Sequence, residues 1–269
     1  MVSTNLFSFR LFFISSALPA IALLAICALD KNEIETKAKK IKIGDRFFIV
    51  LICWLNVEKK YEFSIMNTLS SYFRLSELEA GCDEAGRGCL AGPVFAAAVI
   101  FPKDFVLDGL DDSKKISSSK RFELAKILRS EALSYSIAQV GPQVIDEINI
   151  LNASILAMHK AIEGLDIQPK HLIIDGNRFK PYEKVPYDTI IKGDAKFQTI
   201  AAASILAKTE RDVFMKELHA EYPMYKWEKN MGYPSVEHKL AISQHGHSVH
   251  HRKSFNFKLT EKQVSKLPH

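Results

Sequence analysis

The stretch GCDEAGRG (81–88), followed by LAGPVFAAAVIF (90–101), decides the fold of this chain. The apolar run of small residues is bounded by prolines and predicts a strand over 92–101. A shorter strand is expected to end at Cys82–Asp83. Two glycines then flank Arg87, which lets the backbone approach a ligand closely. A plain glycine-containing turn after a solvated strand end is the alternative interpretation.

Helical and strand patterns alternate along the rest of the chain. Phe122, Ala125 and Leu128 fall on one face of a helix over 117–132, which Ser117 or Ser118 can cap. The other expected elements are strands over 135–140, 171–175 and 187–192, one or two helices over 144–163, and a long helix from 195 to about 222. This order predicts an α/β domain.

The composition limits the classes that are possible. Of 269 residues, 47% are hydrophobic and 25% charged, which excludes a disordered or low-complexity chain. Four cysteines without a CxxC pair argue against a disulfide scaffold and against a cysteine zinc site. The formal net charge is +5, but residues 66–269 hold 27 basic and 25 acidic side chains. Any affinity for nucleic acid must therefore come from a local patch.

The first 65 residues differ from the rest. Residues 11–29 form an uncharged apolar run, long enough for a marginal membrane span and similar to an export signal. A membrane anchor, a cleaved signal, and translated upstream sequence outside the working protein are the three interpretations. We favour the third, because Met66 stands just before the globular body.

Carboxylates stand at several predicted element ends. Asp83 and Glu84 end one strand, Asp175 ends another, and Asp194 is expected to cap the long helix. Each alone has a purely structural interpretation. Together they would lie at the ligand-binding edge of an open sheet, where their charges would repel unless a cation sat between them. Oxygen ligands favour Mg²⁺ or Mn²⁺, and two such ions are typical of phosphodiester hydrolysis.

Several long motifs resemble one family in the family's own order. They are GCDEAGRG (81–88), LAGPVFAAAVIF (90–101), LDDSKKIS (110–117), INILNASILAMHKA (148–161), IIDGN (173–177), IKGDAKFQTIAAASILAKTERD (191–212), MGYPSVEH (231–238) and HRKSF (251–255). The chain resembles bacterial ribonuclease HII, in the ribonuclease H-like superfamily, over roughly 75–257. Cys89 departs from the proline that the family often has.

The resemblance implies a ribonuclease H-like fold: a mixed central sheet flanked by helices, with a helical C-terminal extension. The domains would be 1–65, an apolar extension outside the working fold, 66–222, the catalytic domain, and 223–269, the substrate-flanking extension.

The resemblance also implies roles for single residues. The metal-binding catalytic carboxylates would be Asp83, Glu84, Asp175 and Asp194. The ribose 2′-hydroxyl would be read by Gly86, Arg87 and Gly88, with Tyr233 stacking on the sugar and Lys114 contacting a phosphate. Arg87 could instead pair with a carboxylate and only orient the site. Asp212 lies about 27 Å from Asp194 along a helix and receives a structural role. The histidine cluster from His245 to His251 lacks nearby cysteines, so we expect no zinc site there.

The expected activity is hydrolysis of the RNA strand of RNA–DNA hybrids, with cutting 5′ to single ribonucleotides embedded in duplex DNA. Two Mn²⁺ or Mg²⁺ ions would leave 3′-hydroxyl and 5′-phosphate ends. We expect a cytoplasmic monomer without an obligate protein partner. The alternatives are a ribonuclease HIII-type enzyme and a membrane-tethered protein that binds nucleic acid without cutting.

Overall fold

The structure is a computed structural model that describes only part of the chain. The described residues are 69–74, 78–103, 105–110, 113 and 115–260. The chain divides into Met1–Met66 and Asn67–His269, and every described residue lies in the second unit. The apolar run 11–29 and Lys114 fall outside the described residues, so the predictions made for them stay predictions.

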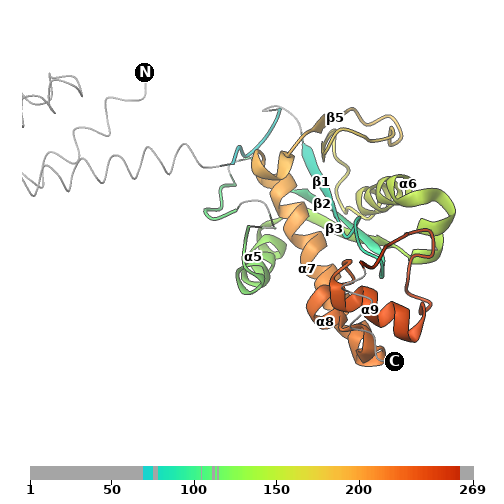
Figure 1. The fold of residues 1–269 in the computed structure, drawn as a ribbon. Helices are drawn as coiled ribbons and strands as arrows, with labels where there is room; N and C mark the ends of the chain where they lie inside the picture. Colours follow the sequence, from blue (N-terminus) through green and yellow to red (C-terminus); the bar gives the residue numbers. More distant parts are fainter. Residues whose placement is uncertain (1–68, 75–77, 104, 111–112, 114, 261–269) are drawn as a thin grey trace, which may run out of the picture. The chain divides into compact units, whose positions relative to one another are not determined.

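A five-stranded mixed sheet forms the centre of the described unit (Figure 1). The strand order is β3-β2-β1-β4-β5, with antiparallel pairing from β3 to β1 and parallel pairing from β1 to β5. The bounds are β1 Glu79–Ala85, β2 Val94–Ile100, β3 Ser134–Val140, β4 His171–Asp175 and β5 Tyr187–Ile190. The expected α/β class and mixed sheet are confirmed.

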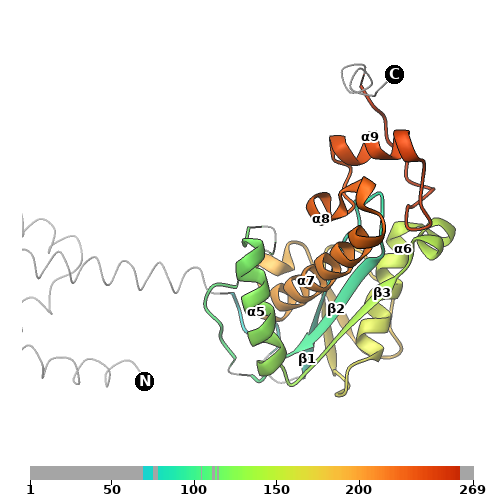
Figure 2. The ribbon, with the colours of Figure 1, turned by 90° about the horizontal axis from the view of Figure 1, so that it is seen from below.

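Helices cover both faces of the sheet (Figure 2). One face packs against α5 (Ser118–Glu131) and α7 (Gln198–Glu221), and the other against α6 (Pro142–Glu163). Strand β2 is buried on both sides: Ala96 and Ala98 join the core under α6, whereas Phe95 joins the core under α5 and α7. Its small side chains allow close packing on both faces.

Side-chain caps explain where α5 begins and why α6 is interrupted. Ser117 caps α5 by accepting a hydrogen bond from the Lys120 amide, as expected. Asn149 interrupts α6 with a φ of 66° and a ψ of 164°. Its side-chain oxygen accepts from the Asn152 amide at 3.1 Å, so the second part of α6 starts with a cap of its own.

The long helix begins later than the sequence predicts. Asp194 belongs to a short 3₁₀ turn, η1 (Gly193–Ala195), and α7 begins only at Gln198, so the prediction that Asp194 caps it is wrong. The Gly193 carbonyl accepts from the amides of Lys196 and Phe197, which closes a separate turn before the helix. Asp194 is thereby buried, with 6% of its surface exposed.

The first turn of α7 packs directly on β1. A Cβ on Gly81 would lie 2.4 Å from the Thr199 carbonyl carbon, so only glycine permits this approach. The contact brings the turn that carries Asp194 toward the sheet edge where β1 ends.

The chain after α7 is helical, as expected for the extension. It forms η2 (Pro223–Tyr225), α8 (Trp227–Asn230) and α9 (Val236–His245). Trp227 and Met215 pack in one buried cluster with Leu90 and Ala91, which lie in the loop between β1 and β2. The division between 66–222 and 223–269 stays a prediction. Among the described residues, no helix is both long and apolar enough to cross a membrane.

Candidate active site

Two of the predicted carboxylates meet because β1 and β4 run parallel. The register pairs Cys82 with Ile174, so Asp83 and Asp175 follow at the same edge of the sheet. Asp83 is 5% exposed, and one of its oxygens accepts from the Glu84 amide at 2.6 Å. Burial raises the pKa of Asp83 well above its usual value, and the negative charges of Glu84 and Asp175 raise it further. Repulsion among these negative charges therefore disfavours the ionised form of Asp83.

The turn before α7 joins this edge. The Gly193 amide donates to Oδ1 of Asp175 at 2.8 Å, which places Asp194 one residue from the contact. A Cβ on Gly193 would lie 2.5 Å from Cδ1 of Ile200, so a larger residue here would make that side chain move. The structure thus brings all four predicted carboxylates to the ends of β1 and β4 and to the turn beside them.

The donor chemistry fits a divalent cation. Crowded carboxylate oxygens are the ligands that Mg²⁺ and Mn²⁺ prefer, and a cation would relieve the repulsion that raises the Asp83 pKa. Within the described part of the chain, no three acidic, histidine or cysteine side chains already converge as ligands. Glu84 instead pairs with Nη1 of Arg87 at 3.0 Å. The second oxygen of Glu84 is not used by this ion pair.

The glycines of the loop after β1 have different functions. Gly86 has a φ of +96°, and a Cβ there would lie 2.1 Å from Nε of Arg211. Gly86 is therefore needed for the conformation of the loop and for the packing of Arg211. A Cβ on Gly88 would meet nothing within 4 Å, so this glycine faces open space. Arg87 is exposed and paired with Glu84, which is the orienting interpretation considered for it.

Arg211 of α7 joins this loop to the segment of Tyr233. Its guanidinium donates to the carbonyls of Pro93, Ala91 and Met231 at 3.2, 3.1 and 2.9 Å. It also lies over the Tyr233 ring, with Cζ 5.7 Å from the ring centroid.

Tyr233 itself lies partly in the open. Its side chain keeps 39% of its surface exposed. Nζ of Lys208 lies 5.5 Å from the centre of the ring. Burial, followed by interaction with Cys89, raises the pKa of Tyr233 to about 12, so the phenol stays protonated at neutral pH. Cys89 is a buried free thiol next to this hydroxyl.

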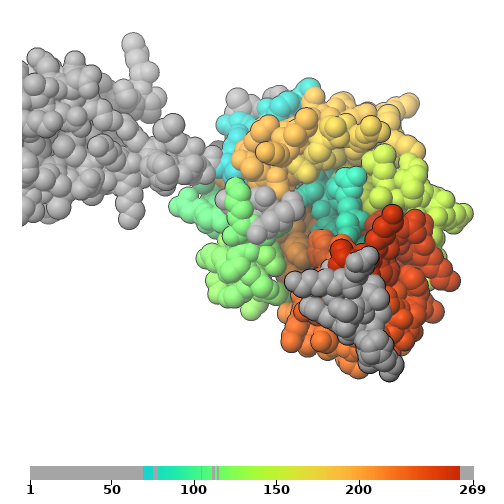
Figure 3. Space-filling model, in the orientation of Figure 1, coloured from blue at the N-terminus to red at the C-terminus, as the bar shows by residue number. Residues whose placement is uncertain are grey.

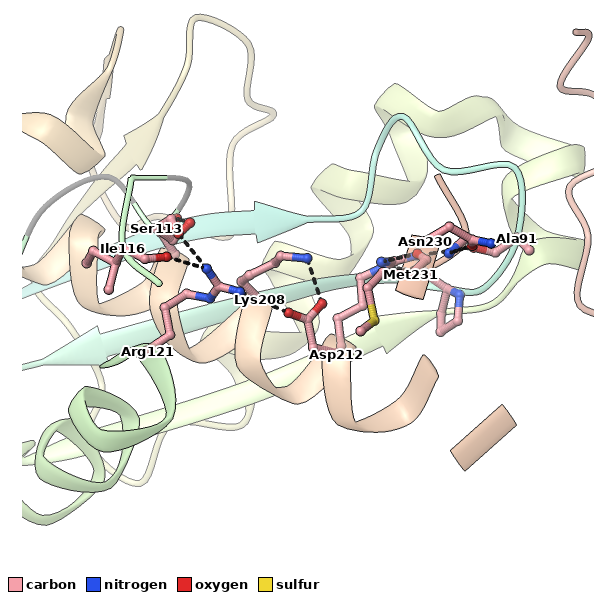
Figure 4. Close-up of polar contacts among 12 residues, drawn as sticks. Ala91, Ser113, Ile116, Arg121, Lys208, Asp212, Asn230 and Met231 are labelled. Carbon is pink, nitrogen blue, oxygen red and sulfur yellow. Dashed lines mark hydrogen bonds and ion pairs between the residues drawn. The ribbon is translucent and has the colours of Figure 1, made fainter. Parts of the chain in front are cut away.

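A buried network on α7 surrounds Asp212 (Figure 4). Asp212 binds Nζ of Lys208 at 2.6 Å and Nη2 of Arg121 at 3.3 Å. Arg121 also donates to the carbonyls of Ser113 and Ile116. The network agrees with the structural role expected for Asp212, and it fixes the loop that contains Ser113.

Ser113 also reaches toward the carboxylates. Its hydroxyl lies 2.9 Å from that of Ser204 on α7, and both side chains are buried. The Ser204 hydroxyl in turn bonds the Asp83 carboxylate, which lowers the pKa of that group against the larger effect of burial. The predicted phosphate-contacting loop is therefore tied to the carboxylate edge.

A cavity of about 200 Å³ opens beside the carboxylates. Glu84, Arg87, Asp175, Asn177 and Arg178 line it, together with residues of α6. In the space-filling view, the teal part of the chain lies recessed between the orange, green and red segments (Figure 3). A larger hollow of about 690 Å³ lies along the edge strand β3. The smaller cavity is lined by Glu84 and Asp175, whereas neither residue lines the larger hollow.

Sequence reasoning missed a buried histidine pair in the extension. His238 Nε2 lies 3.0 Å from Trp227 Nε1 and 3.1 Å from His251 Nε2, and its Nδ1 lies 2.9 Å from the Tyr233 carbonyl. His251 Nδ1 accepts from the Ser248 amide. With both rings neutral, Nδ1 of His238 donates to the Tyr233 carbonyl, and its Nε2 is the shared acceptor of the Trp227 and His251 N–H groups. Within the described residues the histidines form no metal-binding group.

Arg252 was quoted within a motif, but sequence reasoning gave it no role. It is 1% exposed and donates to three loop carbonyls. The basic HRKSF pattern was the only signal in the sequence. The carbonyls that Arg252 binds lie about 160 positions away in the chain, so no local pattern could indicate them.

A mixed sheet with carboxylates at adjoining strand ends, beside an exposed glycine loop, defines a protein of the ribonuclease H-like class. A family model described as "Ribonuclease HII" matches residues 80–258, which is more than half of the chain. The chain belongs to the ribonuclease HII family.

Known proteins support this assignment. The "Ribonuclease HII" of Phocaeicola vulgatus is 55% identical over 196 residues, covering 73% of this chain and 98% of the relative. That of Christiangramia forsetii is 58% identical over 176 residues, covering 65% and 89%.

Solved structures share the fold. The ribonuclease H2 of Pyrococcus horikoshii has a TM-score of 0.56 at 24% identity, covering 70% of this chain and 96% of that one. A PCNA:RNase HII complex from Archaeoglobus fulgidus gives 0.57 at 25% identity, covering 68% and 97%.

Proposed function

We propose that this protein is a metal-dependent endoribonuclease that hydrolyses the RNA strand of RNA–DNA hybrids and cuts 5′ to single ribonucleotides in duplex DNA. The observation that carries the proposal is the pairing of Asp83 and Asp175 at one sheet edge, beside a loop whose glycine at position 88 is open to a ligand. Metal-assisted phosphodiester hydrolysis uses the first feature, and a loop open to a ligand can recognise a sugar hydroxyl.

The four carboxylates would hold the cations. Asp83, Glu84, Asp175 and Asp194 supply oxygen ligands, and two Mn²⁺ or Mg²⁺ ions bound there would activate water and stabilise the leaving oxygen. A structure titled as ribonuclease HIII from Bst in complex with Mn²⁺ shares the fold, with a TM-score of 0.52. Burial of Asp83 supports the role, because low-dielectric surroundings strengthen every interaction with a cation.

The remaining predicted residues would bind the nucleic acid. Arg87 and Gly88 lie exposed in the loop after β1, where the backbone can meet a 2′-hydroxyl. Tyr233 offers a partly exposed ring for stacking on the sugar. Because these contacts address sugar and backbone, the base sequence of the substrate should matter little. Lys114 completes the proposal as a phosphate contact.

The sequence and its relatives favour this proposal over a non-cutting binding protein and over a ribonuclease HIII-type enzyme. The family match and the presence of all four carboxylates favour a cutting enzyme over a tethered binding protein. The curated relatives favour the HII over the HIII type. Cys82 and Cys89 are free thiols, which suits a reducing cytoplasm, where we place a monomeric enzyme.

The test is cleavage of a DNA duplex that contains one ribonucleotide, with Mn²⁺ or Mg²⁺ added to the full chain. We expect a single cut 5′ to the ribonucleotide that leaves a 3′-hydroxyl and a 5′-phosphate, and none in an all-DNA duplex. Product ends are mapped by gel mobility and by phosphatase sensitivity. No cut by the folded protein, or an equal cut of the all-DNA duplex, would overturn the proposal.

A further inference from the structure

Arg252 is buried directly beneath the loop that follows β1. Its Nη2 donates to the Gly86 carbonyl and its Nη1 to the Arg87 carbonyl, both at 2.8 Å. Its Nε donates to the Gly92 carbonyl at 3.0 Å, and its backbone amide donates to the Leu90 carbonyl at 2.8 Å. One residue thus holds four carbonyls of the loop over 86–93 from the inside.

The geometry of the peptide bond gives these contacts a second consequence. In a trans peptide the carbonyl and the amide hydrogen point in opposite directions, and this chain has no cis peptide among its described residues. The Gly86 carbonyl belongs to the same peptide as the Arg87 amide, and the Arg87 carbonyl to the same peptide as the Gly88 amide. Because both carbonyls face Arg252, both amides face away from it.

The two outward amides have room for a ligand. Arg87 and Gly88 are exposed, and no described group accepts a hydrogen bond from either amide. A Cβ on Gly88 would meet nothing within 4 Å. Two adjacent amides that point the same way can bind one oxygen atom, as they do in other anion and hydroxyl sites of proteins.

Other contacts fix Arg252 itself. Asp146, near the start of α6, accepts from the amides of Lys253 and Ser254 and from the Ser254 hydroxyl. The Phe255 ring lies under the guanidinium, with its centroid 5.1 Å from Cζ. In the described part of the chain Arg252 makes no ion pair with a carboxylate. The three carbonyls stabilise its charge together with the Phe255 ring and the nearby Asp146, and burial lowers its pKa to about 10, so it remains a cation.

We propose that Arg252 is a positioning residue for ribose recognition: it holds the carbonyls of Gly86 and Arg87 inward so that the amides of Arg87 and Gly88 face the 2′-hydroxyl. This inference rests on the proposed function, and it assigns a mechanism to the HRKSF segment. A lysine at 252 keeps the charge, but its donors share one nitrogen, so it cannot replace the three separate nitrogens that reach Gly86, Arg87 and Gly92. A freed carbonyl can turn to solvent, and its peptide then turns the amide inward.

The test is an affinity ratio. Binding to a duplex with one ribonucleotide and to the matching all-DNA duplex is measured by fluorescence anisotropy, with Ca²⁺ in place of Mn²⁺ and a gel to show that nothing is cut. The variants are Arg252→Lys and, as a second way to loosen the same contacts, Asp146→Ala, which releases the amides of Lys253 and Ser254 beside Arg252. Arg129→Lys is the matched control, because Arg129 forms a half-exposed ion pair with Glu210, away from the loop. Thermal unfolding of each variant is recorded.

The expected result is a wild-type preference for the ribonucleotide duplex that falls at least about tenfold in Arg252→Lys, with all-DNA affinity unchanged. Arg129→Lys should keep the wild-type ratio. An unchanged ratio in Arg252→Lys overturns the inference alone, and so does an equal loss of affinity for both duplexes, which marks a merely structural role. If Arg252→Lys does not fold, the same ratio in Asp146→Ala decides. Absence of any preference in the wild type overturns the proposed function together with the inference.

Discussion

The sheet edge that carries the carboxylates and the buried arginines beneath the loop after β1 differ in charge and in the contacts that hold them. At the edge, Asp83 lies buried beside two further negative side chains, Glu84 and Asp175. Under the loop, Arg211 and Arg252 lie buried as two cations that donate to backbone carbonyls and lie over aromatic rings. A metal ion would complete the first region, and a phosphodiester strand would complete the second.

The two regions also differ in what holds them in place. Neighbouring strands align Asp83 with Asp175 by register, which is a repeating backbone pattern. The loop is held by side chains from α7 and from the C-terminal segment, far away in the chain. Local pattern thus builds the catalytic half, and long-range packing builds the half that we assign to recognition.

The largest effect is expected at the carboxylate edge. Asp83→Asn removes a charge that the proposed cations need, and several kcal/mol of transition-state stabilisation correspond to a loss of about 1000-fold or more in cleavage rate. The variant should unfold at the same temperature as the wild type or higher, because a buried charge and its repulsion disappear. Single-turnover cleavage and thermal unfolding measure both. Asp166→Asn, at an exposed carboxylate, is the control, and a fully active Asp83→Asn would contradict the assignment.

The next effect separates the two loop glycines. Gly86→Ala places a methyl group against Arg211 at a positive φ and should lower the free energy of unfolding by roughly 1–3 kcal/mol. Gly88→Ala should change it by less than about 0.5 kcal/mol but weaken binding of a ribonucleotide duplex. Urea unfolding and anisotropy separate these outcomes. Equal destabilisation by both substitutions would show that the loop is not seated on Arg211.

If Tyr233 stacks on the sugar, removing its ring should weaken binding of the ribonucleotide duplex. Tyr233→Ala should weaken binding of the ribonucleotide duplex by about 1–3 kcal/mol, the usual contribution of an aromatic ring stacked on a nucleotide. Tyr233→Phe keeps the ring and should bind like the wild type, because the hydroxyl faces Cys89. Titrations of both variants against the same duplex give the comparison. A Phe variant as weak as the Ala variant would assign the role to the hydroxyl instead.

Much of the fold could be predicted from the sequence, but the buried arginine contacts beneath the loop after β1 could not. The apolar run of β2 between two prolines and the helical face of α5 indicated their elements because both patterns are local. The cap of the long helix was mispredicted, since the hydrogen bonds of Gly193 close a separate turn before it. Arg252 received no role, because a basic motif gives no sign that its guanidinium lies buried against backbone carbonyls.

The smallest effect concerns the histidine pair that supports the Tyr233 segment. Burial and the neighbouring His238 lower the pKa of His251 to about 3, whereas an unfolded histidine titrates near 6.5. Between these values the unfolded chain binds the additional proton. Stability is therefore complete above about pH 6.5 and falls as the pH drops toward 3, by up to about 1.4 kcal/mol per pH unit for one histidine.

The measurement is urea unfolding between pH 7 and pH 5. His251→Gln should show a flatter pH dependence than the wild type, whatever its absolute stability. His159→Gln is the control, because His159 lies on α6, away from this pair, where its ring contacts Phe179 and Tyr182. Equal slopes in the wild type and His251→Gln would contradict a neutral buried pair.

The separation of the two regions is the central claim, and Mn²⁺ titration followed by electron paramagnetic resonance tests it most directly. The wild type, Asp83→Asn and Arg252→Lys are compared without nucleic acid. The account predicts that Asp83→Asn loses at least about tenfold in Mn²⁺ affinity, since it removes a charged ligand. Arg252→Lys should bind Mn²⁺ as the wild type does. Equal Mn²⁺ affinity in Asp83→Asn and the wild type, or an equal loss in both variants, would contradict the account.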